Sequence, residues 1–244
     1  HTHDDQEEAV NIINKYGLIA LPVVDKEMRI VGIVTVDDAM EVLQEETTED
    51  ISMMAGIVAT SEDDYFATSV WKHASSRFPW LLFLMLSATL SGLALGRFEA
   101  VLVAMPILNT FVPMLTGTGG NCGSQSSTLI IRGLATETIE FKDIFKVIFK
   151  EVLVAGIVGV MLAVVNAVRI VIMYRDVMLA VTLGITLICT VLLSKVIGCV
   201  LPLLAKKCKL DPALMAAPLI TTLVDTGTIV VFYNSNTDFK ALIL

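Results

Sequence analysis

Long apolar stretches from Pro79 onward limit what this chain can fold into more than any other feature of its sequence. Five of them approach the ~20 residues that a helix needs to cross a bilayer. The apolar fraction of the whole chain, 55%, is above that of ordinary soluble domains. We therefore predict a mostly α-helical membrane protein with five transmembrane helices, the second long and interrupted, over residues 79–96, 100–133, 148–173, 177–204 and 212–233.

The N-terminal third has a different composition and predicts a small acidic module. Residues 1–77 contain 16 Asp/Glu and 5 Lys/Arg, whereas residues 78–244 contain 9 and 12. Its hydrophobic pattern changes from helical to alternating and back, which is typical of a compact α+β unit. The expected elements are a helix over 5–16, strands over 19–24 and 29–34, and a helix from Val36 with Ala39, Met40 and Leu43 on its apolar face.

An amphipathic helix is expected to connect this module to the first apolar stretch. Ser61 can cap its start, and its apolar face holds Tyr65, Phe66, Val70 and Trp71. We divide the chain into a partial regulatory module at 1–50, a connecting helix within 51–78 and a transmembrane domain at 79–244. Because the chain begins at His1, in what reads as the middle of a domain, we expect it to be a piece of a longer protein.

Basic residues in the predicted loops indicate the orientation in the membrane. If the N-terminal module is cytosolic, nine Lys/Arg fall on the cytosolic side and four on the other, in agreement with the positive-inside rule. We therefore expect a multi-pass protein of the cell inner membrane with its C-terminus outside. The cytosolic set is Lys72, Arg77, Arg132, Lys142, Lys146, Lys150, Lys206, Lys207 and Lys209, and the outer set is Arg97, Arg169, Arg175 and Lys240.

Several function classes do not fit the composition. Nucleic-acid binding needs clustered Lys/Arg, whereas the module is acidic. The four cysteines show no CxxC spacing and read as small apolar residues. All three histidines precede the apolar stretches, and the sequence has no Ser/His/Asp arrangement, so we do not expect an enzyme.

The segment from Thr116 to Thr128 is polar and uncharged, although both of its flanks are apolar. It contains four glycines and follows Pro113, so we expect irregular backbone there, which is tolerated at membrane depth only inside protein or beside water. Its oxygen atoms would line a cavity and suit a hard cation. Close helix packing is the alternative, but it does not account for Asn121 together with Gln125. The candidate ligands are Gly119, Gly120 and Asn121.

Asp225 is the second candidate, because it lies deep inside the last apolar stretch. Asp211 and Pro212 predict the N-cap and first position of that helix, which places Asp225 ~20 Å along it. An intramembrane carboxylate is a functional-site candidate by default. The alternative is a salt bridge with Lys195, a basic residue well inside another span. The threonines expected on the same helical face are Thr221, Thr222 and Thr228, and Thr221 and Thr228 join Asp225 as candidate pore ligands.

Carboxylates crowd the second helix of the module. The fourteen positions 37–50 hold seven of them, six of which are candidate ligands, and their mutual repulsion requires neutralisation by a cation if they are to pack. A solvated acidic linker is the alternative. Just before this helix, Thr35 is either a plain N-cap or part of a ligand site. The six residues are Asp37, Asp38, Glu45, Glu46, Glu49 and Asp50.

Together these segments resemble the MgtE family of magnesium channels. Leu21–Asp25 and Gly32–Asp38 look like the second CBS module of that family. The similarity covers essentially the whole chain, without the amino-terminal domain and the first CBS module of the family. The segments that match its membrane domain are Trp80 after Arg77 and Pro79, the run Gly117–Gln125, Leu210–Leu214 and Pro218–Asp225.

The resemblance implies a homodimer whose pore runs along the two-fold interface and is lined by the second and fifth spans. Asp225 is then the selectivity carboxylate, and Asn121 lies in the matching second-span segment. It also implies that Mg²⁺ regulates the protein through the six carboxylates, and that Thr35 and Asp38 hold the ribose of ATP. One departure is Ala217, where some members carry an asparagine before the proline.

The function expected from these features is passive conduction of hydrated Mg²⁺, gated by cytosolic Mg²⁺. The expected partners are a second copy of the chain and membrane lipid, not nucleic acid. A CBS-regulated channel for another ion and a membrane-anchored nucleotide sensor are the alternatives. Asp225 and the polar run favour the cation channel, because a simple anchor needs neither.

Overall fold

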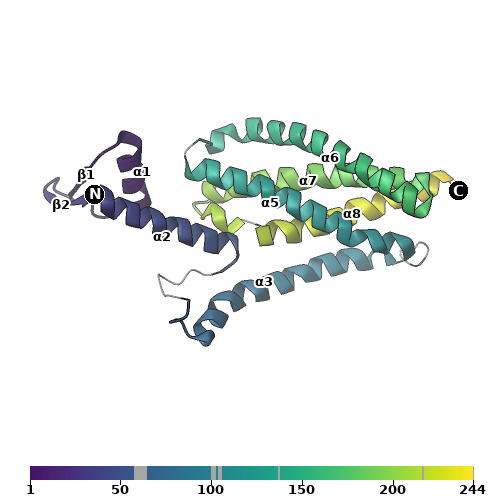
Figure 1. Ribbon diagram of the computed structural model, residues 1–244, viewed down its shortest axis with the longest axis horizontal. Coiled ribbons are helices and arrows are strands. Elements are labelled where there is room, and N and C mark those ends of the chain that lie inside the picture. Colours follow the sequence, from purple (N-terminus) through teal and green to yellow (C-terminus); the bar gives the residue numbers. More distant parts are fainter. Residues whose placement is uncertain (58–64, 100–102, 104–105, 137, 216, 244) are drawn as a thin grey trace.

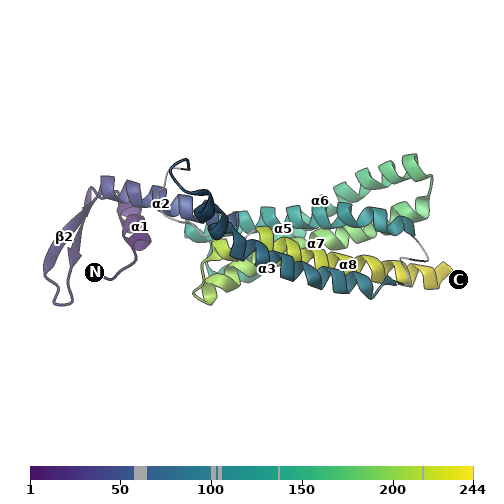
Figure 2. The ribbon, with the colours of Figure 1, turned by 90° about the horizontal axis from the view of Figure 1, so that it is seen from below.

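The protein is elongated, with a small α/β head at one end and a bundle of long helices that ends at the C-terminus (Figure 1). The computed structural model describes residues 1–57, 65–99, 103, 106–136, 138–215 and 217–243. A view turned by 90° shows the same separation of head and bundle (Figure 2).

The head has the predicted order of helix, strand, strand and helix. Helix α1 (Gln6–Tyr16) begins after Asp5, whose carboxylate accepts a hydrogen bond from the Glu7 N–H at 3.1 Å, and ends at Gly17 with φ of 61°. This φ is one that glycine adopts readily. Strands β1 (Ala20–Val24) and β2 (Ile30–Thr35) pair antiparallel, and α2 (Val36–Met54) follows directly.

The core of the head is small and leaves an apolar face open. Val10, Ile13 and Ala39 are buried, whereas Met40 and Leu43 are 68% and 50% exposed. Met40 and Leu43 share the predicted apolar face with Ala39, and all three border an open pocket of about 340 Å³. The pattern therefore predicted the face of the helix, but the head supplies too little chain to cover it.

The connection to the bundle differs from the prediction. Ser61 lies outside the described residues, and Tyr65 and Phe66 form a turn rather than a helix. Helix α3 (Val70–Gly96) begins after Ser69, whose hydroxyl accepts a hydrogen bond from the Lys72 N–H at 3.3 Å. It runs through Pro79 without interruption, although an interior proline removes one N–H donor and crowds the carbonyl four residues earlier. The predicted boundary at 78/79 is thus inside one helix.

The bundle consists of long helices joined by short turns. Helix α7 is central and packs against α5, α6 and α8, while α3 lies outside and contacts α8 (Figure 1). The elements are the 3₁₀ turn η1 (Pro106–Phe111), α5 (Val112–Ala135), η2 (Phe141–Asp143), α6 (Ile144–Tyr174), α7 (Val177–Lys207), η3 (Pro212–Met215) and α8 (Ala217–Ile243).

Within the described part of the chain, three segments are long and apolar enough to cross a membrane: Val70–Gly96, Phe141–Tyr174 and Val177–Lys207. They correspond to the first, third and fourth predicted spans. Helix α8 contains a shorter apolar stretch, Leu219–Asn234, and the polar run lowers the hydropathy of α5. The structure therefore supports a largely helical protein with several apolar helices, and five crossings stay a prediction.

Candidate pore and regulatory sites

The polar run forms a regular part of α5, so the predicted irregular backbone is wrong. Its glycines allow α5 to approach α7 and α8 closely. A Cβ added to Gly119 would lie 2.8 Å from Cγ1 of Val224, and one added to Gly123 would lie 2.6 Å from Cγ2 of Ile220. Side chains at these positions would collide with the neighbouring helix, which explains glycine on a packed helix face.

The other face of α5 is polar and open in the protomer. Asn121, Gln125 and Thr128 are exposed, and at ~100° per residue they lie on one side of the helix. Close packing explains the glycines but not this face. An uncovered polar face on a helix with apolar flanks needs water or another protein surface beside it at membrane depth.

Asp225 is partly buried on α8. The helix begins at Ala217 rather than at Pro212, because Asp211 instead accepts a hydrogen bond from the Ala213 N–H at 2.7 Å and starts the 3₁₀ turn η3. Asp225 is therefore only ~12 Å along α8. It still lies near the middle of the apolar stretch Leu219–Asn234.

The threonines around Asp225 differ in their surroundings. Thr221 packs against Gly120, where an added Cβ would lie 2.8 Å from its Cγ2, so α5 meets α8 one helical turn from the carboxylate. Thr228 is 1% exposed and points into the protomer. Thr222 contributes its backbone carbonyl to a hydrogen bond from the Thr226 hydroxyl at 3.1 Å. The side-chain surroundings of Ala217 lie outside the described part of the structure.

The salt bridge considered between Asp225 and Lys195 is absent. Lys195 Nζ instead lies 3.4 Å from Glu151 Oε2 on α6 and donates a hydrogen bond to Ser126 Oγ on α5 at 3.1 Å. Within the described residues, no lysine or arginine forms an ion pair with Asp225. Asp225 is thus a carboxylate inside an apolar stretch that has no counterion among the residues that the structure describes.

Glu151 was missed by the sequence analysis, although the signal was present. It lies inside the third predicted span and has the charge opposite to that of Lys195 in the fourth. Two ionisable residues of opposite sign within neighbouring spans predict a pair. The sequence analysis considered only Asp225 as a partner of Lys195, and that alternative is wrong.

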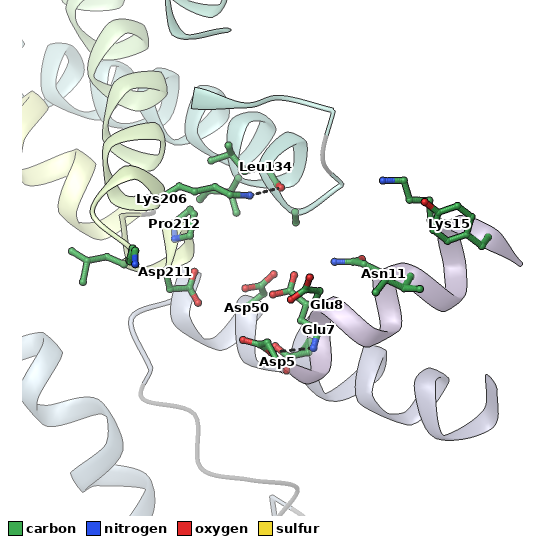
Figure 3. Close-up of a pocket in the computed structure, with 17 residues that line it drawn as sticks. Asp5, Glu7, Glu8, Asn11, Lys15, Asp50, Leu134, Lys206, Asp211 and Pro212 are labelled. Carbon is green, nitrogen blue, oxygen red and sulfur yellow. Dashed lines mark hydrogen bonds between the residues drawn. The ribbon is translucent and has the colours of Figure 1, made fainter. Parts of the chain in front are cut away.

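An acidic pocket of about 650 Å³ lies where the head meets the bundle (Figure 3). Helix α1 contributes Glu7 and Glu8, α2 contributes Asp50, and the turn after α7 contributes Asp211. Lys206 lies on the bundle side and donates a hydrogen bond to the Leu134 carbonyl at 3.0 Å. The pocket is lined by six carboxylates in all, namely those of Asp5, Glu7, Glu8, Glu46, Asp50 and Asp211.

The carboxylates in this pocket repel one another. Burial, followed by repulsion from Glu46 and Asp50, raises the pKa of Glu7 above its ordinary value. Burial, followed by repulsion from Asp211 and Glu46, raises the pKa of Asp50. Both shifts show that negative charge is disfavoured here, so a bound cation would relieve the repulsion.

The six predicted regulatory carboxylates do not form one cluster. Glu46 and Asp50 line the acidic pocket, and Glu49 adds to the repulsion on Asp50. Asp37 lies in the first turn of α2, away from the pocket, because α2 is long enough to separate its two ends. The described residues contain no preassembled group of three or more Asp, Glu, His or Cys that could hold a metal ion.

Thr35 and Asp38 are bonded to each other at the start of α2. The Thr35 backbone N–H and hydroxyl both donate to Asp38 Oδ2, at 2.9 and 2.5 Å. These bonds, the hydroxyl first, lower the pKa of Asp38. The arrangement gives both side chains a helix-capping role.

Comparison with known proteins places these sites in a family context. The sequence profile of the divalent cation transporter family MgtE matches residues 112–235, which include α5, Asp225 and the helices between them. The chain belongs to the MgtE family. A CBS domain profile matches residues 1–45. The family is one of transporters, not enzymes.

Three relatives carry the name magnesium transporter MgtE. The Thermus thermophilus protein is 38% identical over 233 residues, the Bacillus subtilis protein 34% over 235, and the Enterococcus faecalis protein 30% over 234. These alignments cover 95–96% of this chain and 51% of each relative. The chain thus spans about half the length of the curated relatives it matches.

Proposed function

We propose that this chain is the membrane part, with the adjoining CBS segment, of a channel that conducts hydrated Mg²⁺ down its electrochemical gradient. The observation that carries the proposal is Asp225, a carboxylate in the middle of an apolar stretch with no ion-pair partner among the described residues. Such a charge is costly unless water or a cation reaches it. The family match and the names of the relatives support a divalent cation.

Asp225 and Asn121 are proposed to contact the ion through its water shell. Mg²⁺ dehydrates reluctantly and usually keeps several waters, so one carboxylate and one amide per protomer suit it better than a closed cage. Gly120 has a different role, because it lets α5 approach Thr221 and brings the two polar surfaces together. Gly119 and Thr228 are buried in the protomer and support the packing behind the pore.

The pore is proposed to form between two copies of the chain. The open face of Asn121, Gln125 and Thr128 needs a polar or aqueous neighbour at membrane depth, and a second protomer related by a two-fold axis supplies the same face. We further propose five membrane crossings in the inner membrane, with the head cytosolic and the C-terminus outside.

The acidic pocket is proposed as the regulatory site. Cytosolic Mg²⁺ would neutralise Glu7, Asp50 and Asp211, hold the head against the bundle and favour a closed pore. At low Mg²⁺ the repulsion would separate head and bundle, because a ligand stabilises whichever state binds it better. We further propose that an adenosine nucleotide binds at Thr35 and Asp38. Its ribose would have to compete with the capping hydrogen bonds between these two residues.

The test is Mg²⁺ flux into liposomes that contain the purified full chain and a Mg²⁺-sensitive dye. The proposal predicts uptake above that of protein-free liposomes, driven by the gradient alone and without ATP. Uptake no faster than in protein-free liposomes, from protein that is folded and inserted, would refute it.

A further inference from the structure

A buried polar layer crosses the bundle where α5, α6 and α7 meet. Ser126 donates a hydrogen bond to Glu151 Oε2 at 2.6 Å, and Lys195 Nζ donates to Ser126 Oγ at 3.1 Å. The side chains of Lys195 and Glu151 are only 6% and 12% exposed. The hydroxyl of one helix therefore joins the opposite charges of two others.

Apolar layers enclose this polar layer on both sides. On the side away from the head, Cys122, Ala155 and Val191 form one buried cluster. Each of them lies four residues along its own helix from a residue of the polar layer. On the side toward the head, Ile130 and Cys199 belong to a second buried cluster, against which Val147 packs. These three also lie four residues along their helices from the polar layer. Each helix contributes one residue per turn to the stack, so the charges have no route to bulk water along it.

The packed face of α5 carries small side chains. It consists mainly of glycine, serine and cysteine: Gly119, Gly120, Cys122, Gly123, Ser126 and Ser127 are all buried. Small side chains allow α5 to approach α8 closely, and a hydrogen bond adds a directional preference to that packing. A buried polar contact can select one arrangement among several that apolar packing permits, as a polar core residue does in coiled coils.

We propose that Ser126, Glu151 and Lys195 form a lock that fixes the rotation of α5 about its axis. Asn121 is five residues from Ser126 and therefore about 140° around the helix, on the face opposite the lock. With Ser126 held, Asn121 and Gln125 stay on the open face. The three are positioning residues, and pairing with Lys195 keeps Glu151 itself from binding a cation. The consequence for conduction rests on the proposed function.

The first test uses the accessibility of position 121 rather than transport. In the full chain, with Cys189 and Cys208 replaced by serine, Asn121→Cys is labelled with a positively charged thiol reagent. Ser126→Ala removes only the hydroxyl and should slow labelling at position 121 at least threefold. Ser124→Ala is the matched control, because its hydroxyl bonds to the Gly120 carbonyl within α5 at 2.8 Å, and should leave the rate unchanged.

The second test uses both charges. Glu151→Gln with Lys195→Met keeps the volume without the ion pair and should slow labelling at position 121 about tenfold. The exchange Glu151→Lys with Lys195→Glu keeps a pair that a serine hydroxyl can bridge in either direction, and should restore the rate of the parent. An exchanged variant that labels as slowly as the neutral one would assign the effect to side-chain shape and overturn the lock.

The outcomes separate the lock from the proposed function. An unchanged labelling rate in both Ser126→Ala and the neutral double variant overturns the lock, whatever the chain transports. A parent that labels at position 121 but shows no Mg²⁺ flux overturns the proposed function and leaves the lock intact. A folded parent that resists the reagent at position 121 contradicts both.

Discussion

Gly120 and Thr221 hold α5 and α8 closer together than any residue with a side chain at position 120 would allow. A Cβ added to Gly120 would lie 2.8 Å from Cγ2 of Thr221 and 3.4 Å from its Cβ. Thr221 is one helical turn before Asp225, so this contact sets the position of the carboxylate relative to the polar face of α5. In the proposed pore, the glycine therefore has a packing role rather than that of a ligand.

Gly120→Ala is therefore expected to destabilise the protein by roughly 1–3 kcal/mol through overpacking and to reduce Mg²⁺ flux. Gly156→Ala on α6 is the control, because nothing lies within 4 Å of its added Cβ and alanine favours the helix. Thermal unfolding in detergent and liposome flux would be measured for both. Equal stability of the two variants would contradict the role given to the contact.

Asn121→Leu should lower flux at least tenfold without lowering stability. The side chain is exposed in the protomer, so an apolar replacement removes the amide without creating a cavity or a clash. Asn121→Gln keeps the amide and should retain part of the flux. If Asn121→Leu conducted like the parent, the open face of α5 would be a lipid or packing surface instead.

The acidic pocket predicts a pH-dependent effect of Asp50→Asn. The pKa of Asp50 is raised in the folded protein, so its ionisation opposes folding, and this loss of stability develops as the pH rises above the ordinary value of an aspartate. Asp50→Asn should therefore raise the thermal stability at pH 7 without divalent ions, by about 1–2 °C, and have no such effect near pH 3.

The same variant should respond less to Mg²⁺. The parent is expected to gain stability on Mg²⁺ addition, and Asp50→Asn to gain less, because one ligand is missing and less repulsion remains to be relieved. Glu41→Gln is the control, since Glu41 is exposed on the same helix and does not line the pocket. If Mg²⁺ leaves the thermal stability of the parent unchanged, the pocket is not the regulatory site.

Local patterns predicted the head and most of the helices well. The order of helix, strand, strand and helix and the alternating strands depend on short-range hydrogen bonds and backbone preferences, which the sequence shows directly. The apolar runs likewise depend on the thickness of the bilayer. The start of α8 was misplaced because Asp211 caps a 3₁₀ turn, and the two kinds of turn share the same capping residues.

The candidate sites were predicted less completely, because they depend on which helices become neighbours. The glycines on α5 fit both an irregular loop and a packed face, and only contacts with Val224 and Thr221 distinguish the two. From the sequence, Lys195 could pair with either Asp225 or Glu151. The packing of α6 against α7 selects Glu151. The acidic pocket joins Glu7 to Asp211, which are about 200 positions apart, so crowding along α2 alone identified only part of it.

The most direct test of the account is Mg²⁺ flux through Asp225→Asn in liposomes, compared with the parent and with Glu140→Gln, which removes an exposed carboxylate outside the long helices. Asparagine keeps the size of the side chain and removes its charge, so stability and assembly should be those of the parent. The account predicts flux close to that of protein-free liposomes for Asp225→Asn and parental flux for Glu140→Gln. A folded Asp225→Asn protein that conducts Mg²⁺ as fast as the parent would contradict it.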